Sequence, residues 1–249
     1  RNAMDPESAD ALVQAFLAFD ADPSANVAVL WGEGGAFCAG WDLKFASTLS
    51  DRDAFQRDVV DSLAFPTGAN AAPRGPLGPT RLELSKPVIA AVEGPAVAGG
   101  MELALWCDIR VMADDAYFGV YCRRWGIPLL DGGSVRLARL VGQGRAMEII
   151  LSGRKVTAEE ALRIGMCEQL ADAGHARFAA EAMAHNIARF PQAAVRADRR
   201  SVQETYGLPV RDAMRREWAN GVEAHFKEGA AGAARFAGGR GRHGNFEDI

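Results

Sequence analysis

One carboxylate stands out because it lies in the first turn of a predicted helix that is otherwise apolar. Residues 94–106 are GPAVAGGMELALW, and Glu102 is their one charged side chain. Glu102 follows Gly99 by three residues, so the two lie on the same face of the helix. Partial burial raises the pKa of a carboxyl group and lets it exchange protons near neutral pH. The position of Glu102 therefore predicts a general acid/base beside a ligand held at Gly99.

Two glycine-rich turns, residues 34–43 (GGAFCAGWDL) and 94–103 (GPAVAGGMEL), each follow the end of a predicted strand. Glycine turns expose backbone N–H groups, and a helix N-terminus adds positive potential. Side by side, two such turns can aim two N–H donors at one oxygen, which is an oxyanion hole. Either turn alone is better explained by tight packing of a strand on a helix, because a lone glycine motif is weak evidence. The carboxylate of Glu102 shifts the balance towards a ligand site.

The elements that must position these groups follow an α/β pattern. Apolar runs predict buried strands at 26–31, 87–92 and 108–112, and the last two flank a βαβ unit with a right-handed crossover. The carboxyl ends of parallel strands gather on one side of a sheet and form its ligand crevice. The other predicted elements are a helix that begins at Asp5-Pro6, helical segments at about 41–62, a loop at 65–80, a mostly helical region beyond about 131, a helix capped by Thr157, and helices over 174–237.

The composition argues against several classes of protein. The chain has 249 residues and a net charge of −4, which gives no bulk electrostatic case for binding nucleic acid or a membrane surface. No apolar run reaches the roughly 18 residues of a membrane span. The four cysteines form no CxxC pair and lie apart from the four histidines in the sequence. We therefore expect reduced thiols, a cytoplasmic protein and no metal site.

Five stretches, in this order and spacing, resemble the crotonase superfamily, the enoyl-CoA hydratases and isomerases: GGAFCAGWDL, KPVIAAVEGPAVAGGMELALWCDIRV, AYFG, GGSVRLARLVG and AMEIILSGRKVTAEEALRIGMCEQL. The resemblance runs from Arg1 to about Leu170. It implies a crotonase-like α/β fold, a spiral of ββα units with a helical C-terminal region. Residues 1–190 would form the acyl-CoA-binding core and residues 191–249 a trimerisation or lid region.

The resemblance also implies a ligand and an assembly. The substrate would be a coenzyme A thioester, with no further cofactor, and the protein would be a homotrimer or hexamer. Members usually carry a strand or hairpin before the motif that RNAM resembles, so we expect a short N-terminal segment before Arg1.

Individual site residues follow from the resemblance as well. The N–H groups of Trp41 and Gly99 would bind the thioester oxygen. The remaining residues implied in substrate or CoA binding are Ala3 (near the adenine), Ala39, Asp42, Leu43 and Gly100.

The sequence departs from the family pattern at one catalytic position. Hydratases of this family use two glutamates; the first matches Glu102, but Cys122 stands at the second. A thiol with an ordinary pKa is mostly protonated at pH 7, so Cys122 is either a weak participant or a buried filler. Asp131 either reaches the pocket as a catalytic carboxylate or caps the helix that follows it. It lies one residue beyond the isomerase carboxylate position, which holds Leu130.

Three hypotheses therefore compete. The leading one is an acyl-CoA enzyme that hydrates or isomerises an enoyl-CoA with Glu102 as acid/base. The second is an acyl-CoA-binding protein with weak or no catalysis, which fits Cys122. The third is a serine peptidase of a distantly similar fold, which we set aside because Met101 stands where the nucleophile would be. Trp106 and Trp125 are expected in the core, and the pair Arg123-Arg124 in ion pairs within or between subunits.

Overall fold

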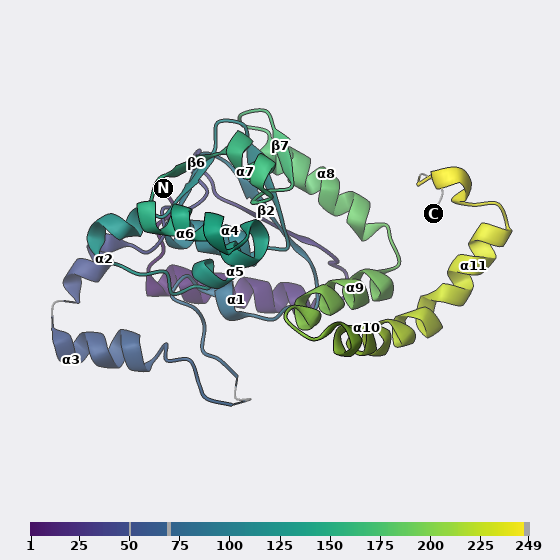
Figure 1. Cartoon of the computed structure of the whole chain (residues 1–249), viewed down its shortest axis with the longest axis horizontal. Helices are drawn as coiled ribbons and strands as arrows, with labels where there is room; N and C mark the ends of the chain where they lie inside the picture. Colours follow the sequence, from purple (N-terminus) through teal and green to yellow (C-terminus); the bar gives the residue numbers. More distant parts are fainter. Residues whose placement is uncertain (50, 69–70, 247–249) are drawn as a thin grey trace.

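A four-stranded parallel sheet forms the centre of the protein (Figure 1). The computed structural model describes residues 1–49, 51–68 and 71–246. In order across the sheet, the strands are β1 (Ala28–Trp31), β2 (Val88–Val92), β4 (Ile109–Ala113) and β7 (Gln169–Ala171). The strands predicted at 87–92 and 108–112 are confirmed as β2 and β4. β2 is buried along its whole length because it is an interior strand made only of apolar residues.

The first strand differs from its prediction in one respect. Every residue of β1 is half-buried rather than buried. The reason is its place at the edge of the sheet, where it pairs only with β2, from Ala28 opposite Val88 to Trp31 opposite Ala91.

The predicted βαβ unit is present, with one addition. β2 and β4 pair in parallel, and α4 (Gly99–Trp106) lies between them in the chain. The connection also contains β3 (Pro95–Val97), which pairs in parallel with β5 (Tyr117–Gly119). β6 (Lys155–Thr157) completes this second sheet as an antiparallel neighbour of β5. Strands of three residues are too short to show a period, so the sequence did not predict them.

The helix boundaries follow local capping rules. Asp5 caps α1 (Pro6–Ala21) and accepts the N–H of Ser8 at 2.8 Å, as predicted. Thr157 caps α7 (Ala158–Ile164), also as predicted, and Gly165 ends it with a φ of 75°. The remaining elements before the C-terminal region are α2 (Leu43–Thr48), α3 (Arg52–Phe55), the π-helix η1 (Gln56–Asp61), η2 (Pro79–Arg81), η3 (Tyr121–Trp125), α5 (Gly133–Val141), α6 (Gln143–Ser152) and α8 (Ala176–Ala188).

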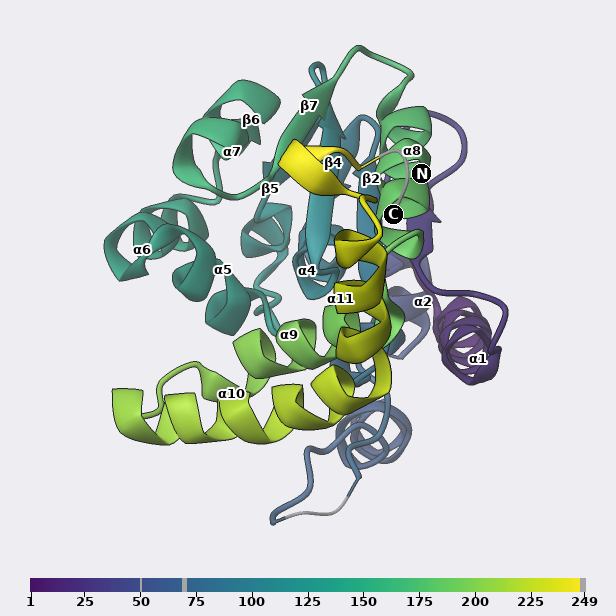
Figure 2. The same cartoon turned by 90° about the vertical axis from the view of Figure 1, so that its right-hand side faces the viewer.

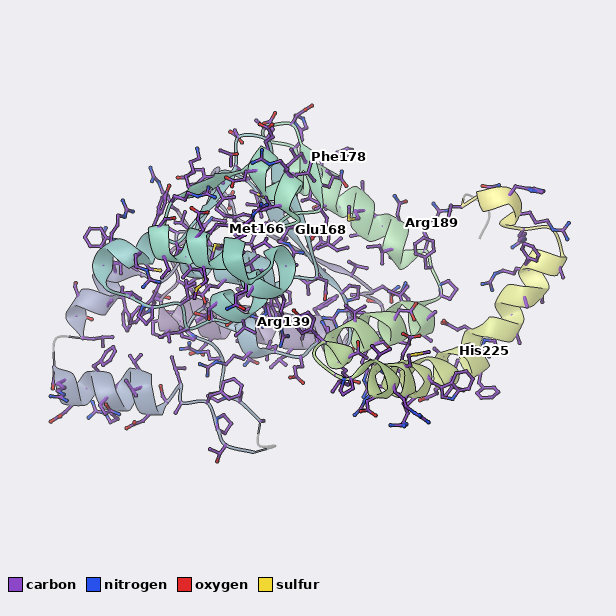
Figure 3. All side chains as sticks on the ribbon, in the orientation of Figure 1. Arg139, Met166, Glu168, Phe178, Arg189 and His225 are labelled. Carbon is purple, nitrogen blue, oxygen red and sulfur yellow. The ribbon has the colours of Figure 1, made fainter. Side chains whose placement is uncertain are left out.

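Buried polar groups tie the layers together. Lys86 donates to the carbonyl oxygens of Phe19 and Asp22 at 2.7 and 2.5 Å, which closes the C-terminal end of α1. Arg110 on β4 pairs with Glu168, which Figure 3 labels beside the sheet, at 2.5 Å. These contacts give buried polar groups hydrogen-bond partners, without which their burial would destabilise the folded protein. They also hold the sheet that positions the site.

The C-terminal region is helical, as predicted, and leads away from the sheet. It contains α9 (Gln192–Thr205), α10 (Val210–Ala224), η4 (His225–Gly229), α11 (Ala230–Ala237) and η5 (Arg242–Gly244). Figures 1 and 2 show α9 and α10 below the sheet, and Figure 1 shows α11 extending to one side. Val210, Met214 and Trp218 follow each other at four-residue intervals on α10 and are exposed. The division at residue 190 and the trimerisation role stay predictions.

Within the described ranges, no helix combines the length and the apolar character that a membrane span requires.

Candidate active site

The two glycine-rich turns lie against each other, as their sequences predicted. Cys38 forms a parallel bridge with Ala96, and the N–H of Val97 donates to the carbonyl oxygen of Cys38 at 3.0 Å. A Cβ atom on Gly40 would lie only 2.9 Å from the backbone nitrogen of Gly99, and Gly40 has a φ of +87°. Glycine is required at this crossing, because both the space and the backbone conformation exclude a side chain.

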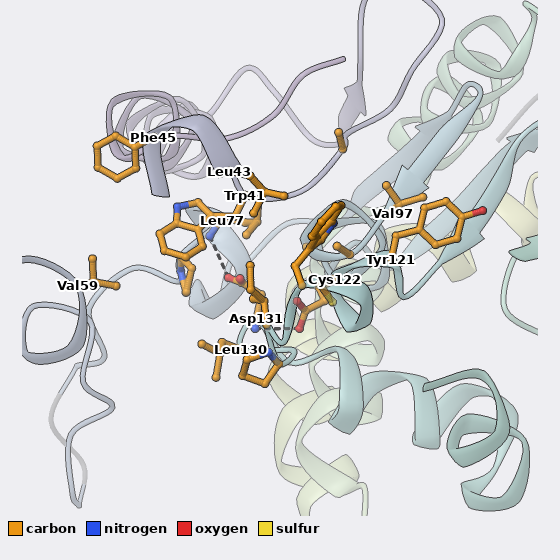
Figure 4. Close-up of a pocket in the computed structure, with 18 of the residues that line it drawn as sticks. Trp41, Leu43, Phe45, Val59, Leu77, Val97, Tyr121, Cys122, Leu130 and Asp131 are labelled. Carbon is orange, nitrogen blue, oxygen red and sulfur yellow. Dashed lines mark hydrogen bonds between the residues drawn. The ribbon is translucent and has the colours of Figure 1, made fainter. Parts of the chain in front are cut away.

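A pocket of ≈370 Å³ opens where the two turns meet α4 (Figure 4). Its lining is largely apolar, which suits a small-molecule site. The predicted site residues in the lining are Ala39, Trp41, Leu43, Gly99, Glu102, Cys122 and Asp131. Seven positions spread over more than ninety residues of sequence therefore converge on one pocket.

Three predicted binding residues lie outside this lining. Asp42 instead caps α2 and accepts the N–H groups of Lys44 and Phe45 at 2.7 and 3.3 Å. Ala3 is exposed, and Gly100 is buried so closely against Cys38 that a Cβ would overlap the Cys38 carbonyl oxygen. Contact of these three residues with a CoA ligand stays a prediction.

Glu102 is buried at the base of the pocket and caps the next helix. Its Oε1 accepts the N–H of Asp131 at 2.9 Å and the N–H of Gly133 at 2.8 Å, at the N-terminal end of α5. Glu102 is 2% exposed. A Cβ on Gly133 would lie 2.6 Å from Glu102 Cγ, so this approach requires glycine. Burial, and after it the charge of Asp131, raise the pKa of Glu102 to about 7.

Asp131 points its carboxylate into the pocket wall. Oδ1 accepts the N–H of Leu77 at 3.1 Å (Figure 4). It also accepts the hydroxyl of Thr80. The N-cap of α5 is Gly132, and it has no side-chain capping bond. Of the two roles considered for Asp131, capping of this helix is therefore wrong, because Glu102 accepts the N–H groups at the start of α5 and the Asp131 carboxylate accepts from the loop. Burial raises the pKa of Asp131, while the Thr80 hydrogen bond opposes that rise.

Cys122 is buried on η3 and lines the pocket. Burial, followed by the charge of Glu102, raises the pKa of the Cys122 thiol above its ordinary value. The thiol is therefore protonated near neutral pH. All four cysteines of the chain are free and buried.

The two tryptophans of this region differ from each other. Trp106 packs edge-on against Phe16 and donates its indole N–H to Leu82 at 3.1 Å, as expected of a core residue. Trp125 is 62% exposed, so its assignment to the core was wrong. It ends the single-turn helix η3 at the pocket, where the guanidinium of Arg124 lies 5.8 Å from its ring centroid.

The neighbouring arginines make no salt bridge within the part of the chain that the structure describes. Arg123 donates to the carbonyl oxygen of Ile150 at 3.4 Å, and Arg124 to that of Tyr121 at 3.4 Å. The intramolecular ion pair expected for them is thus not formed, and pairing between subunits stays a prediction.

Sequence reasoning missed the part of the site supplied by the predicted loop at 65–80. Leu77 lies between Gly75 and Gly78, which exchange backbone hydrogen bonds of 2.9 Å in both directions. The pattern G-P-L-G-P signals such a tight turn. A Cβ on Gly99 would lie 2.5 Å from Leu77 Cδ2, so this loop packs directly on the second glycine turn. Apolar residues from α2 to just beyond η1 also line the pocket, namely Leu43, Phe45, Phe55, Val59 and Leu63.

The chain matches known proteins over most of its length. The family model described as "Enoyl-CoA hydratase/isomerase" matches residues 1–65 and 79–237. The enoyl-CoA hydratase EchA19 of Mycobacterium tuberculosis is 34% identical over 237 residues, which cover 92% of this chain and 83% of the relative. The carnitinyl-CoA dehydratase of Salmonella paratyphi B is 34% identical over 216 residues, which cover 86% of this chain and 77% of the relative. The crystal structure of the enoyl-CoA hydratase EchA1 from Mycobacterium marinum aligns with a TM-score of 0.81 at 34% identity, covering 96% of this chain and 88% of that one.

Proposed function

The chain belongs to the enoyl-CoA hydratase/isomerase family, and from this premise we propose that it moves a proton at the α carbon of an enoyl-CoA thioester, with Glu102 as general acid/base. The crotonase-like α/β fold with a helical C-terminal region, expected from the sequence, is confirmed by the structures that this chain resembles. A fold alone does not specify a reaction. The proposal therefore depends on the groups in the pocket.

The observation that carries the proposal is the junction of Glu102 with the two glycine turns in one pocket. Within the described residues, the backbone N–H groups of Trp41 and Gly99 have no acceptor in the chain. Buried N–H groups without a partner are rare in folded proteins, so donors that find no acceptor in the chain are available to a ligand in the pocket. A thioester oxygen held by both would be stabilised as it becomes an enolate, and one such donor contributes roughly 3–4 kcal/mol to transition-state stabilisation.

Hydration proceeds in two balanced steps in this proposal. Ionised Glu102 takes a proton from water while the water oxygen bonds to C3 of the enoyl group. The electron pair of the C2=C3 double bond forms a C1=C2 bond, and the pair of the C=O double bond moves onto the thioester oxygen, where the N–H groups of Trp41 and Gly99 stabilise its negative charge. Protonated Glu102 then returns the proton to C2 and the carbonyl re-forms. Because the pKa of Glu102 is about 7, both of its forms are populated near neutral pH.

Isomerisation is the second candidate, and the residue at position 122 favours it. A buried, protonated thiol is a poor partner for holding a water molecule, whereas isomerisation uses no water. Glu102 would remove a proton from C2 of a 3-enoyl thioester and return it to C4, and the double bond would move to C2–C3. Leu130 lies in the pocket lining at the position where isomerases of the family place a carboxylate, so Glu102 would act alone.

Turnover of a panel of thioesters tests the proposal. The panel contains 2-enoyl-CoA and 3-enoyl-CoA esters of several chain lengths, with loss or gain of the conjugated thioester measured by absorbance. We expect turnover of at least one ester. Saturable binding of acyl-CoA without any turnover would favour the acyl-CoA-binding protein instead. Absence of both binding and turnover would contradict the proposal.

The assembly is part of the same proposal. Val210, Met214 and Trp218 form an exposed apolar row at four-residue intervals along α10, and contiguous exposed apolar residues are typical of contact surfaces. A second copy of this chain would cover it in a trimer or hexamer. Light scattering at micromolar concentration measures the mass, and a monomer would contradict the assembly. The four free, buried cysteines agree with a reducing compartment such as the cytoplasm.

A further inference from the structure

Asp131 connects three parts of the pocket wall. Its backbone N–H donates to Glu102 on α4, and its carboxylate accepts from Leu77 and Thr80. Arg136, one turn into α5, donates to the carbonyl oxygens of Asp131 and Thr80 at 2.7 Å each. One residue therefore fixes the loop that carries Leu77, the start of α5 and the carboxylate of Glu102.

The two carboxylates are packed into one buried corner. Asp131 and Glu102 are 3% and 2% exposed. A Cβ on Gly75 would lie 2.5 Å from Asp131 Oδ1, and one on Gly133 would lie 2.6 Å from Glu102 Cγ. Glycines on both sides thus allow the backbone to approach the carboxylates directly, which leaves each of them little contact with bulk water. Charges interact strongly at such sites.

Among the described residues, the other titratable and charged side chains that face this corner are Cys38, Arg81, Cys122 and Arg136. Burial raises the pKa of both thiols, to about 11 for Cys38, so neither carries charge near pH 7. The two arginines face Asp131 and lower its pKa against the effect of burial. The charge of Asp131 in turn raises the pKa of Glu102.

We propose that Asp131 is a positioning residue that acts through Glu102: its carboxylate shares the buried corner with that of Glu102, its backbone N–H donates to Glu102 Oε1, and its hydrogen bond to Leu77 holds that residue against Gly99. This inference rests on the proposed function, in which Glu102 exchanges protons with the thioester. It gives this chain two carboxylates at the site despite Cys122. One transfers the proton, and the other sets how tightly the first holds it.

The contacts favour this role over direct proton transfer by Asp131. Oδ1 accepts two hydrogen bonds from the loop, which hold the carboxylate in the pocket wall. Asn has the shape of Asp and keeps an oxygen that can accept both bonds, but it carries no charge. Asp131→Asn therefore separates the charge of Asp131 from its hydrogen bonds.

The experiment measures the titration of Glu102 by the infrared carbonyl stretch of its protonated carboxyl group, in the full-length protein without substrate. The band that Glu102→Gln removes belongs to Glu102. In Asp131→Asn we expect the midpoint of this band to move to lower pH, because a neighbouring negative charge has gone. The pH dependence of turnover should move the same way, with the largest rate kept within about tenfold, which is less than the loss of a proton-transfer group.

The matched control is Asp20→Asn. Asp20 also accepts a backbone N–H and a hydroxyl, both from Ser85 at 2.9 Å, but it lies outside the pocket. This control should leave the midpoint of Glu102 unchanged. Asp131→Ser, which is also neutral, should repeat the shift and serves as the second variant.

The outcomes are distinct. If the titration midpoint of Glu102 is unchanged in folded Asp131→Asn, the inference is overturned and Asp131 has only a structural role in holding the loop. A hundredfold or greater loss of turnover at every pH overturns it in favour of direct proton transfer. Failure of both neutral variants to fold, with Asp20→Asn folded, makes the residue structural and also overturns it. Because the infrared titration needs no turnover, it decides the inference even if no enoyl-CoA is a substrate and the proposed function fails.

Discussion

Two junctions of this molecule use a buried glutamate in the same way, but only one of the two glutamates lines the pocket of the candidate site. Glu93, at the end of β2, accepts the N–H groups of Gly174 and Ala176 at 3.1 and 2.7 Å, where α8 begins. Glu102 accepts two backbone N–H groups where α5 begins. Both side chains are buried and both occupy the positive end of a helix.

The surroundings separate the two junctions. Glu93 lies outside the pocket, whereas Glu102 shares it with the turns of Trp41 and Gly99 and with a second carboxylate, Asp131. A carboxylate that caps a buried helix end therefore has a structural role, and capping alone is no evidence of catalysis. It becomes a candidate for chemistry when an open pocket, N–H donors and a neighbouring charge meet at the same place.

Replacing each glutamate by glutamine gives the largest expected difference between the junctions. Glu102→Gln keeps an oxygen for the two amides but removes the transferable proton. General acid–base groups contribute roughly 10²–10⁴-fold, so turnover should fall by about that factor while the affinity for acyl-CoA changes little. Steady-state kinetics and calorimetry on the same preparation measure both quantities.

The matched control for that change is Glu93→Gln, which should keep full turnover in the folded protein. If Glu102→Gln keeps its activity, the proposed difference between the junctions is wrong, because Glu102 would then have only a structural role, like Glu93. Asp131 would become the residue to test next.

Substitutions of Cys122 test whether a second carboxylate in the pocket would increase hydration at the Glu102 junction. Cys122→Glu restores a second carboxylate beside Glu102 that can hold water across the double bond. We expect hydration of crotonyl-CoA to rise by roughly tenfold, less than a fully adapted acid–base group supplies. Cys122→Ser, the matched control, should be nearly silent because the protonated thiol is a filler. A large loss in Cys122→Ser would instead make the thiol a participant.

The last expected effect concerns stability rather than turnover. The folded-state pKa of Glu102 lies above its ordinary value of 4.5, at about 7, so the native state binds more protons than the unfolded state between these two values. The free energy of unfolding that Glu102 contributes therefore falls as the pH rises through this window, by on the order of 3 kcal/mol. Glutamine does not titrate, so the free energy of unfolding of Glu102→Gln should rise relative to that of wild type as the pH is raised from 5 to 8. Urea unfolding at several pH values measures this difference. A constant difference between the two proteins would mean that Glu102 titrates normally.

Much of the site could be predicted because its signals are local. Glycine turns after apolar strands, and one carboxylate at helical spacing from Gly99, appear within short stretches of sequence. The close crossing of Gly40 and Gly99 follows from the two turns lying on adjacent strand ends. Family motifs supplied the assignment of Trp41.

The features of the fold and the site that were not predicted depend on contacts between residues far apart in the sequence, or on the solvent exposure of a side chain. Asp131 meets Leu77 and Thr80 across 54 and 51 positions, and nothing in either segment indicates the partner. The three-residue strands β3, β5 and β6 exist because they pair with each other, not because of their own pattern. Trp125 was assigned to the core from its side chain alone, although single-turn η3 leaves it exposed.

Exchange of the α protons of a saturated acyl-CoA, such as butyryl-CoA, with D2O tests the central claim most directly, because it isolates proton removal at C2 from hydration and isomerisation. Nuclear magnetic resonance measures the loss of the C2 proton signal at several pH values. The account predicts exchange by the wild-type protein that increases with pH through about 7, where Glu102 loses its proton. Glu102→Gln should lose nearly all of this exchange, and Glu93→Gln should retain it. Exchange by Glu102→Gln at the wild-type rate, or none by the wild-type protein with bound butyryl-CoA, would contradict the account.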